Sequence, residues 1–185
     1  MAESYKTEQI RNIAVVGHAG SGKTTLIEAL LQKASAIPSA GSVQKGTTVC
    51  DFTDKEKRLH HSLDTATCHL EHDDRHINLI DTPGYPDFMG RALGVLPAVE
   101  TAAIVVSGQA GVELVTQRMM DFTAEKPMSV FVPYLVVNPI SGYIQNGTVL
   151  DFSSNWDSIS IDTVSYTHLR AHETEADLVC RLLLE

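Results

Sequence analysis

The chain has 185 residues, of which 43% are hydrophobic and 20% charged, a composition typical of one globular domain that folds in water. Its formal net charge of −9 means that most of the surface would repel nucleic acid, which could bind only at a local patch. No apolar run reaches the length of a membrane span, so we expect no membrane partner. The three scattered cysteines form no CxxC pair, which argues against a disulfide framework and favours the reducing cytoplasm.

The first predicted elements along the chain are a strand, a glycine-rich loop and a helix. Asn12 to Val16 is a short apolar run that predicts a strand, and Thr24 to Leu31 has apolar residues at helical spacing. Ile37 to Leu59 mixes polar and small residues without a lasting period, which predicts a long loop. Loops of this length in compact domains are usually functional or disordered, and we expect a mobile switch here.

Strands and helices continue to alternate after this loop. We predict strands at Leu63 to Leu70, His76 to Ile80 and Ala102 to Val106, a turn at Asp73 and Asp74, and helices at Asp87 to Val99 and Val112 to Glu125. The alternation predicts an α/β fold of the P-loop NTPase type, with a mostly parallel sheet and helices on both faces. Beyond Lys126, prolines and a polar stretch leave no sustained pattern, and we expect an irregular C-terminal part.

The segment GHAGSGKT, from Gly17 to Thr24, matches the phosphate-binding pattern G-x-x-x-x-G-K-[ST] between a strand and a helix. Its backbone N–H groups and the start of the helix would hold the β-phosphate. Lys23 would bridge the β- and γ-phosphates, and the Thr24 hydroxyl would bind Mg²⁺. A glycine-rich turn with a surface lysine is the alternative. The predicted nucleotide contacts here are Gly17, His18 (through its backbone), Ala19, Gly20, Ser21, Gly22, Lys23, Thr24 and Thr25.

A second motif, DTPG, follows the apolar run INLI. Asp81 at the end of this predicted strand can reach the Mg²⁺ shell, and the Gly84 N–H can donate to the γ-phosphate. An ordinary Asp-Pro-Gly turn is the alternative. We predict nucleotide contacts from Asp81, Thr82, Pro83, Gly84 and Tyr85, and catalytic roles for Lys23, Asp81, Gly84 and Tyr85.

The segments GHAGSGKTTL, GTTVCDFTDKEK, INLIDTPGYPDF and GVELVTQRMMDF together resemble the G domain of translational GTPases of the elongation factor G family, in particular its elongation factor G-like subgroup. The resemblance covers Gln9 to Glu125. It implies a domain that binds GTP and Mg²⁺ and hydrolyses GTP on the ribosome. It also implies that Gly41 to Ser62 forms a switch I segment, that a switch II segment follows Asp81, and that the Ser62 hydroxyl joins Thr24 and Asp81 as a Mg²⁺ ligand.

Three departures from the family pattern limit these implications. Tyr85 stands where the family usually has a histidine that positions the attacking water, and a phenol lacks a nitrogen that titrates near neutrality. We therefore expect slow or ribosome-dependent hydrolysis. The guanine-reading NKxD motif has only Asn138 to Ser141 as a candidate, which lacks the aspartate that accepts from guanine. The chain is also too short for the family's later domains.

We expect residues 9–126 to form a truncated GTPase domain, residues 127–163 an uncertain continuation, and residues 164–185 an artefactual tail that resembles translated sequencing-adapter read-through. The preferred function is a GTP-binding and GTP-hydrolysing domain of a monomeric, cytoplasmic elongation factor G-like protein. Two alternatives stay open: a fragment that binds phosphates but is catalytically disabled, and a P-loop NTPase unrelated to translation.

Two weaker patterns have ordinary explanations. Five histidines between positions 60 and 76 lie near acidic residues, but their spacing matches no known metal motif, and solvated side chains are the simpler interpretation. Arg91 follows DTPG and could be an arginine finger in cis, although a surface helix arginine is favoured.

Overall fold

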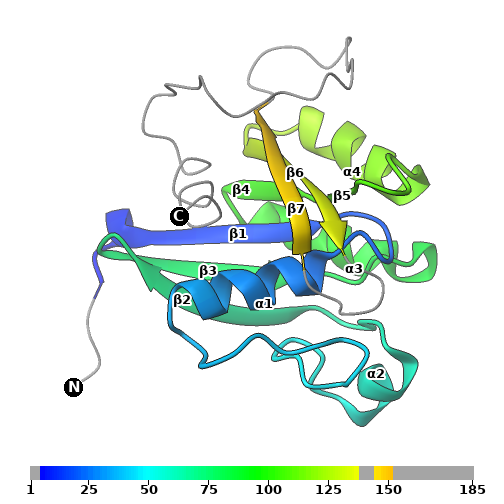
Figure 1. The fold of residues 1–185 in the computed structure, drawn as a ribbon. Coiled ribbons are helices and arrows are strands. Elements are labelled where there is room, and N and C mark those ends of the chain that lie inside the picture. The colour runs from blue at the N-terminus through cyan, green and yellow to red at the C-terminus, as the bar shows by residue number, and fades with distance from the viewer. Residues whose placement is uncertain (1–4, 138–143, 152–185) are drawn as a thin grey trace.

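The computed structural model describes residues 5–137 and 144–151, which form one seven-stranded sheet with helices packed against it (Figure 1). The strands are β1 (Ile10–Val16), β2 (Ala66–His72), β3 (Arg75–Asp81), β4 (Thr101–Ile104), β5 (Val106–Ser107), β6 (Ser129–Val137) and β7 (Ile144–Asp151). The α-helices are α1 (Lys23–Lys33), α2 (Asp54–Leu59), α3 (Met89–Val95) and α4 (Leu114–Ala124), and short 3-10 turns cover Thr7–Gln9, Pro86–Phe88 and Leu96–Ala98. None of the helices within these described residues is long and apolar enough to cross a bilayer.

The sheet is mostly parallel, as the sequence predicts. Strand β1 is paired in parallel with β3 on one side and β4 on the other, and β6 is parallel to both β4 and β5. Only the pairs β2 with β3 and β6 with β7 are antiparallel among the described strands. Because parallel strands end at the same edge, the loops after β1 and β3 meet there, and ligands of open α/β sheets bind at that edge.

Alternating residues of β1 build a hydrophobic core on each face of the sheet. Ile13 and Val15 pack with the apolar side of α1, whereas Ala14 and Val16 pack with α3 and α4. This alternation follows from the two-residue period of a strand. The predicted arrangement with helices on both faces is therefore confirmed, and α1 lies on the viewer's side in Figure 1.

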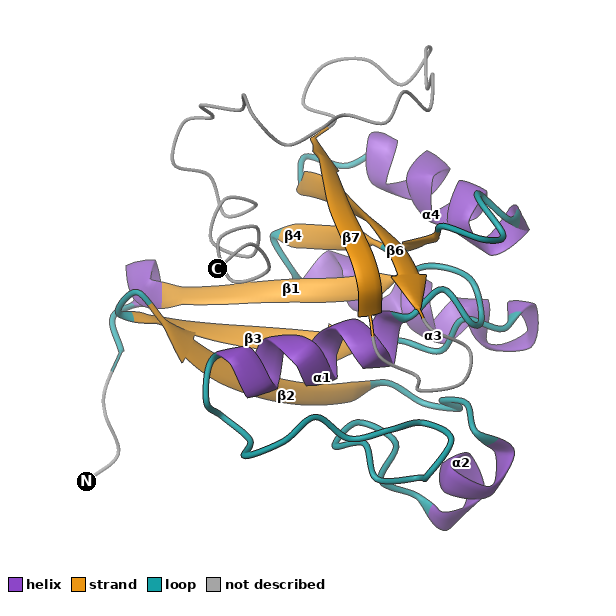
Figure 2. Cartoon of the chain, viewed as in Figure 1, coloured by secondary structure: helices purple, strands orange, loops and turns teal. Residues whose placement is uncertain are grey.

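The predicted long loop from Ile37 to Leu59 contains a helix that the periodicity did not reveal. Thr53 caps α2: its hydroxyl accepts from the Glu56 N–H at 3.2 Å, and the Glu56 carboxylate accepts from the Thr53 N–H at 3.1 Å. This reciprocal pair is the capping box that Thr-x-x-Glu encodes, a signal present in the sequence. The part before α2 is a loop, which Figure 2 shows running beside α1.

Other boundaries also differ from the prediction. The strand expected from Leu63 begins only at Ala66, and the helix expected from Asp87 to Val99 is divided into α3 and two short 3-10 turns. Pro97 lies in the second turn, where its missing N–H and its ring prevent α3 from continuing. The predicted turn at Asp73 and Asp74 is confirmed: both residues have positive φ, 47° and 59°.

Strands β6 and β7 lie in the region where the sequence shows no sustained pattern. Phe131 and Val132 of β6 are each 1% exposed and belong to opposite cores of the sheet. Strand β6 runs through Pro133, which the sequence analysis treated as an interruption. The degenerate segment from Asn138 to Ser141 and the expected tail from 164 to 185 lie outside the described residues.

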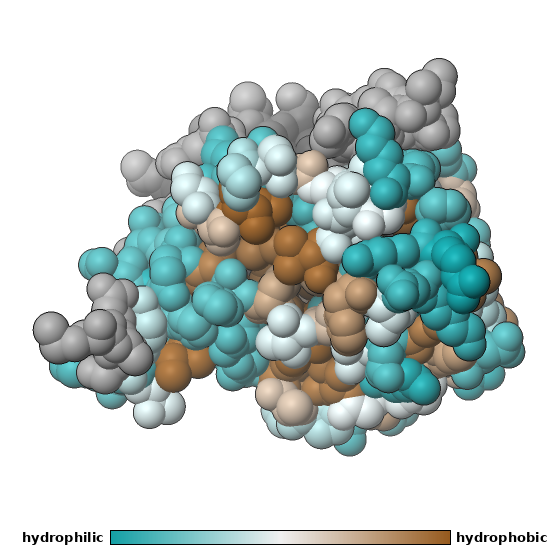
Figure 3. All heavy atoms as spheres, turned by 90° about the horizontal axis from the view of Figure 1, so that it is seen from below, coloured by the Kyte–Doolittle hydropathy of each residue, from teal (hydrophilic) through white to brown (hydrophobic). Residues whose placement is uncertain are grey.

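The segment from Gly41 to Ser62, which the family resemblance implies is switch I, exposes several apolar side chains. Val49, Phe52 and Leu59 are 45%, 62% and 46% exposed. Seen from below, the side of the molecule on which this segment lies shows hydrophobic side chains in patches among polar ones (Figure 3). These three apolar side chains of the segment therefore lie largely on the surface, whereas its Cys50 is buried.

Candidate nucleotide-binding site

The phosphate loop connects β1 to α1 at the edge where the parallel strands end. Gly17 has φ 142°, and a Cβ at this position would contact the carbonyl oxygen of Val105. Only glycine combines this backbone conformation with this close approach. The loop is therefore held against Val105, the residue between β4 and β5.

Lys23 and Thr24 begin α1 and are both buried. The Lys23 Nζ donates to the carbonyl oxygen of His18 at 2.8 Å, which folds the lysine back over its own loop. The Thr24 hydroxyl donates to Oδ2 of Asp81 at 2.6 Å. The structure thus brings together the hydroxyl and the carboxylate that the sequence analysis predicted as magnesium ligands from separate motifs.

Asp81 lies at the end of β3, paired with Val15 of β1, and is 1% exposed. Burial raises the pKa of Asp81 to about 6, against the opposing effects of the Lys23 ammonium and the Thr24 hydroxyl. Burial also lowers the pKa of Lys23 to about 8, and the carboxylates of Asp81 and Asp51 oppose that shift. Both groups are therefore charged between about pH 6 and pH 8.

Several buried polar atoms of this site have no hydrogen-bond partner among the described residues: Oδ1 of Asp81, Oγ of Ser21 and Nε2 of His18. An unsatisfied buried polar group costs about 1–3 kcal/mol, so such groups need an explanation in a native structure. A hydroxyl and a carboxylate oxygen beside a buried lysine suit phosphate oxygens and a hard cation. Ser21, Thr24 and Asp81 therefore fit a nucleotide with Mg²⁺.

The His18 side chain is buried, although the sequence analysis assigned only its backbone to the nucleotide. Its Nδ1 lies 2.7 Å from the Thr116 hydroxyl, which also accepts from the His18 N–H at 3.2 Å. Burial lowers the pKa of His18, and Glu113 only partly offsets the effect. The side chain thus fastens the phosphate loop to α4.

The DTPG segment lies directly against the phosphate loop. A Cβ at Gly84 would contact the Lys23 Nζ and would lie 2.6 Å from the backbone nitrogen of Ala19. Glycine at position 84 is therefore required for the observed packing of the switch II backbone on the loop. Thr82 and Pro83 are buried, and the Thr82 hydroxyl donates to the Val15 carbonyl oxygen at 2.8 Å, which ties the segment to β1.

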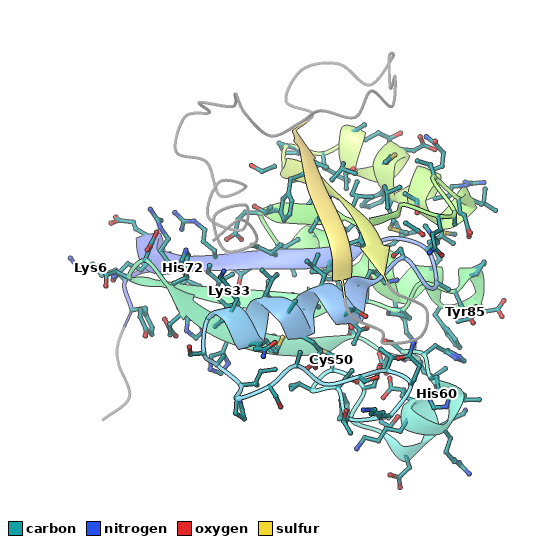
Figure 4. All side chains as sticks on the ribbon, viewed as in Figure 1. Lys6, Lys33, Cys50, His60, His72 and Tyr85 are labelled. Atoms are coloured by element: carbon teal, nitrogen blue, oxygen red, sulfur yellow. The ribbon has the colours of Figure 1, made fainter. Side chains whose placement is uncertain are left out.

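Tyr85 is 42% exposed and turns toward switch I. Its ring lies 4.6 Å from the ring of His61, measured between centroids. Figure 4 shows Tyr85 and His60 at the same end of the molecule. Tyr85 therefore contacts the segment from Gly41 to Ser62 through the His61 ring.

Ser62 makes no hydrogen bond to Thr24 or Asp81 among the described residues; it contacts Asp51, a residue that the sequence analysis missed. The Ser62 hydroxyl donates to Oδ1 of Asp51 at 2.7 Å, and the Thr48 hydroxyl donates to Oδ2 at 3.1 Å. Asp51 is 2% exposed, and its charge acts on both Lys23 and Asp81. A signal was available, because Asp51 lies within GTTVCDFTDKEK, one of the segments that carried the family resemblance.

Neither weaker pattern leads to the nucleotide site. Arg91 forms an ion pair with Asp64 and is about half exposed. Within the described part of the chain, the His, Cys, Asp and Glu side chains form no group of three that could hold a metal ion. The Nδ1 of His76 instead lies 2.6 Å from the Glu71 carboxylate, and its ring stacks on His69.

Comparison with known proteins agrees with this geometry. The family described as Elongation factor Tu GTP binding domain matches residues 8–138. The Elongation factor G-like protein of Mycobacterium tuberculosis H37Rv is 44% identical over 110 residues, which are 60% of this chain and 15% of that protein. The Tetracycline resistance protein TetO of Streptococcus mutans is 36% identical over 109 residues, 59% of this chain and 17% of that protein.

A solved structure of a Thermus thermophilus protein has 40% identity and a TM-score of 0.64, over 67% of this chain and 19% of that one. This chain spans less than a fifth of the length of each of these relatives. The matches remove the alternative of a P-loop NTPase unrelated to translation. The chain belongs to the translational GTPases and carries the GTP-binding domain of that family.

Proposed function

We propose that this domain binds GTP together with Mg²⁺ and hydrolyses it as part of a longer, monomeric and cytoplasmic elongation factor G-like protein that acts on the ribosome. The observation that carries the proposal is the pairing of Thr24 with Asp81 beside Lys23, with Oδ1 of Asp81 left without a partner among the described residues. The similarity to the Elongation factor G-like protein of Mycobacterium tuberculosis supports a role in protein synthesis.

Each residue has a distinct role in this proposal. Lys23 exchanges its bond to the His18 carbonyl for phosphate oxygens, and Ser21 donates its hydroxyl to them. Thr24 and Asp81 hold Mg²⁺, which neutralises charge on the phosphates when bound. The backbone N–H groups of Gly17 to Thr25 surround the β-phosphate, and the Gly84 N–H faces the γ-phosphate.

In this proposal, the rate of GTP hydrolysis depends on Tyr85 and on the ribosome. The phenol can hydrogen-bond a water but lacks the basic nitrogen of a histidine, and here it is partly exposed with its ring against His61. We therefore propose slow hydrolysis that the ribosome stimulates. A domain that binds the nucleotide without hydrolysing it is the remaining alternative.

Guanine selectivity would depend on Asn138 to Ser141, the degenerate candidate for the NKxD motif. We propose that residues 9–126 carry phosphate and metal binding and that residues 164–185 are not native, whereas β6, within residues 127–163, belongs to the sheet of the domain. The serine at position 141 would replace a charge-assisted hydrogen-bond pair to guanine by a weaker neutral one. Binding of GTP over ATP is therefore expected to be weakly selective.

The test is binding of labelled GTP and ATP to the full chain, with and without Mg²⁺. Lys23→Ala should weaken nucleotide binding roughly ten- to hundredfold, since a hydrogen bond to a charged group contributes about 1.5–3 kcal/mol. Lys33→Ala, at the exposed far end of the same helix, is the matched control and should bind like the wild type. Equal affinities for Lys23→Ala and the wild type would refute the site. Phosphate release in single-turnover assays then separates hydrolysis from binding alone.

A further inference from the structure

Glu28 is a buried acidic residue in the middle of α1. It is 1% exposed and lies one helical turn after Thr24, on the helix face that also buries Leu31 and Ile27. Glutamates are almost never fully buried unless they are paired. An unexplained buried carboxylate so close to the nucleotide site calls for a structural reason.

The partners of Glu28 are backbone amides at both ends of the first part of switch I. Oε2 accepts from the Gly41 N–H at 2.6 Å, and Oε1 accepts from the Val49 N–H at 2.5 Å. Such hydrogen bonds to an ionised acceptor are short and roughly twice as strong as neutral ones. One side chain of α1 thus holds the start and the end of this loop.

Two hydrogen bonds join Ser42 to Thr47 within the loop between these two amides. The Ser42 N–H donates to the Thr47 hydroxyl at 3.0 Å, and the Thr47 N–H donates to the Ser42 carbonyl at 3.1 Å. The Val49 side chain is 45% exposed. Because burial of its side chains contributes little, the loop depends on Glu28 for its attachment to α1.

The two residues after Val49 connect this attachment point to the nucleotide site. Cys50, next to Val49, is 3% exposed and packs in the core with α1 and Cys68. Asp51 follows and accepts from the hydroxyls of Thr48 and Ser62. A backbone fixed at position 49 and a side chain buried at position 50 determine where Asp51 enters the site.

We propose that Glu28 is a positioning residue: it latches switch I to α1 and thereby places Asp51 and Ser62 beside the metal-binding end of the nucleotide site. The predicted effect of Glu28 on nucleotide binding rests on the proposed function. The switch segments face the third phosphate, whereas the phosphate loop alone holds the other two. Loss of the latch therefore weakens triphosphate binding more than diphosphate binding.

The test uses the full chain with Glu28→Gln, which keeps the side-chain shape but replaces one acceptor oxygen by an amide donor. In the nucleotide-free protein, hydrogen exchange of the Gly41 and Val49 amides should accelerate about tenfold or more, since a charged hydrogen bond is lost. With Mg²⁺, the affinity for a non-hydrolysable GTP analogue should fall about tenfold while the affinity for GDP stays nearly unchanged. Glu125→Gln, the same change at an exposed position, should alter neither.

Each outcome decides the proposal. Unchanged exchange at Gly41 and Val49 would refute the latch. Faster exchange with equal losses of analogue and GDP affinity would mean a merely structural role and would overturn the positioning claim. If the wild type binds no nucleotide, the proposed function and the positioning claim fail together, whereas the exchange data still decide the latch. Should Glu28→Gln not fold, Glu28→Asp keeps the charge but is too short for both amides and should expose at least one of them.

Discussion

The nucleotide site contains two buried, opposite charges whose pKa values are shifted toward each other. Lys23 and Asp81 are both largely removed from solvent, and burial disfavours the charged form of each. Their mutual attraction offsets only part of that effect. The two buried charges therefore lower the stability of the domain, and a ligand that pairs with both groups would raise it.

This arrangement gives a pH dependence with a definite sign. The pKa of Asp81 is raised from 3.8 to about 6, so the folded state holds this proton more tightly than the unfolded state. The associated stability is present below about pH 4 and is lost as the pH rises to about 6. At about 1.36 kcal/mol per pKa unit, the loss is at most about 3 kcal/mol.

Urea unfolding of the nucleotide-free chain between about pH 4 and pH 7 measures this effect against Asp81→Asn, which cannot titrate. The wild type should lose stability relative to the variant as the pH rises through this window. Other carboxylates contribute equally to both proteins, so the difference between the two curves isolates Asp81. Parallel curves would contradict the assigned burial of its charge.

Among the elements, α2 and the segment after it depend on one side chain. The Glu56 carboxylate accepts from the Thr53 N–H and hydroxyl and from the N–H groups of Leu63 and Asp64. Burial by itself would raise the pKa of Glu56, but these hydrogen bonds outweigh it and lower the pKa. The start of α2 is thereby joined to the end of switch I.

Glu56→Gln should loosen this connection. At about pH 7 we expect a loss of about 1–3 kcal/mol in the local opening free energy, because buried donors lose an acceptor. Since the folded pKa is lowered, the contribution of Glu56 is present above its ordinary pKa and disappears as the pH falls through the lowered value. Hydrogen exchange of the Leu63 and Asp64 amides measures it. Asp54→Asn, at an exposed position of the same helix, should change little, and an equal effect in both variants would count against a specific role for Glu56.

At the scale of the whole molecule, the sheet extends past position 126. Strand β6 pairs with β4 and contributes Phe131 and Val132 to the two cores, and the family match also reaches residue 138. The proposed phosphate and metal residues nevertheless all lie before position 126. The fold therefore includes residues beyond position 126, whereas the proposed nucleotide-binding residues all lie before it.

Two truncations test this division. A chain ending at residue 163 should keep its thermal midpoint and its nucleotide affinity, because we propose that residues 164–185 are not native. A chain ending at Lys126 loses β6 and should be strongly destabilised, since burying a side chain such as Phe131 contributes about 1.5–3 kcal/mol. Differential scanning calorimetry distinguishes them. A drop of several degrees for the longer chain would mean that its last residues pack on the domain.

The family and the parallel sheet could be predicted from the sequence, and the candidate phosphate-binding residues could be proposed from it, because their signals are local. A phosphate loop needs particular residues at fixed short spacing, and strands and helices show their hydrophobic periods within a few turns. The meeting of Thr24 with Asp81 also followed, since both were predicted at the same edge of a parallel sheet.

The contacts that organise switch I were decided only by the tertiary structure. Glu28 accepts from the N–H groups of Gly41 and Val49, and Asp51 accepts from the hydroxyls of Thr48 and Ser62. Each of these contacts joins polar groups that carry no periodic signal. The same is true of β6, whose place in the sheet comes from pairing with β4 rather than from its own pattern. Sequence alone thus determined the family and which groups are proposed to bind phosphate and metal, because those signals are local, whereas packing between distant segments determined what holds the segment from Gly41 to Ser62 around them.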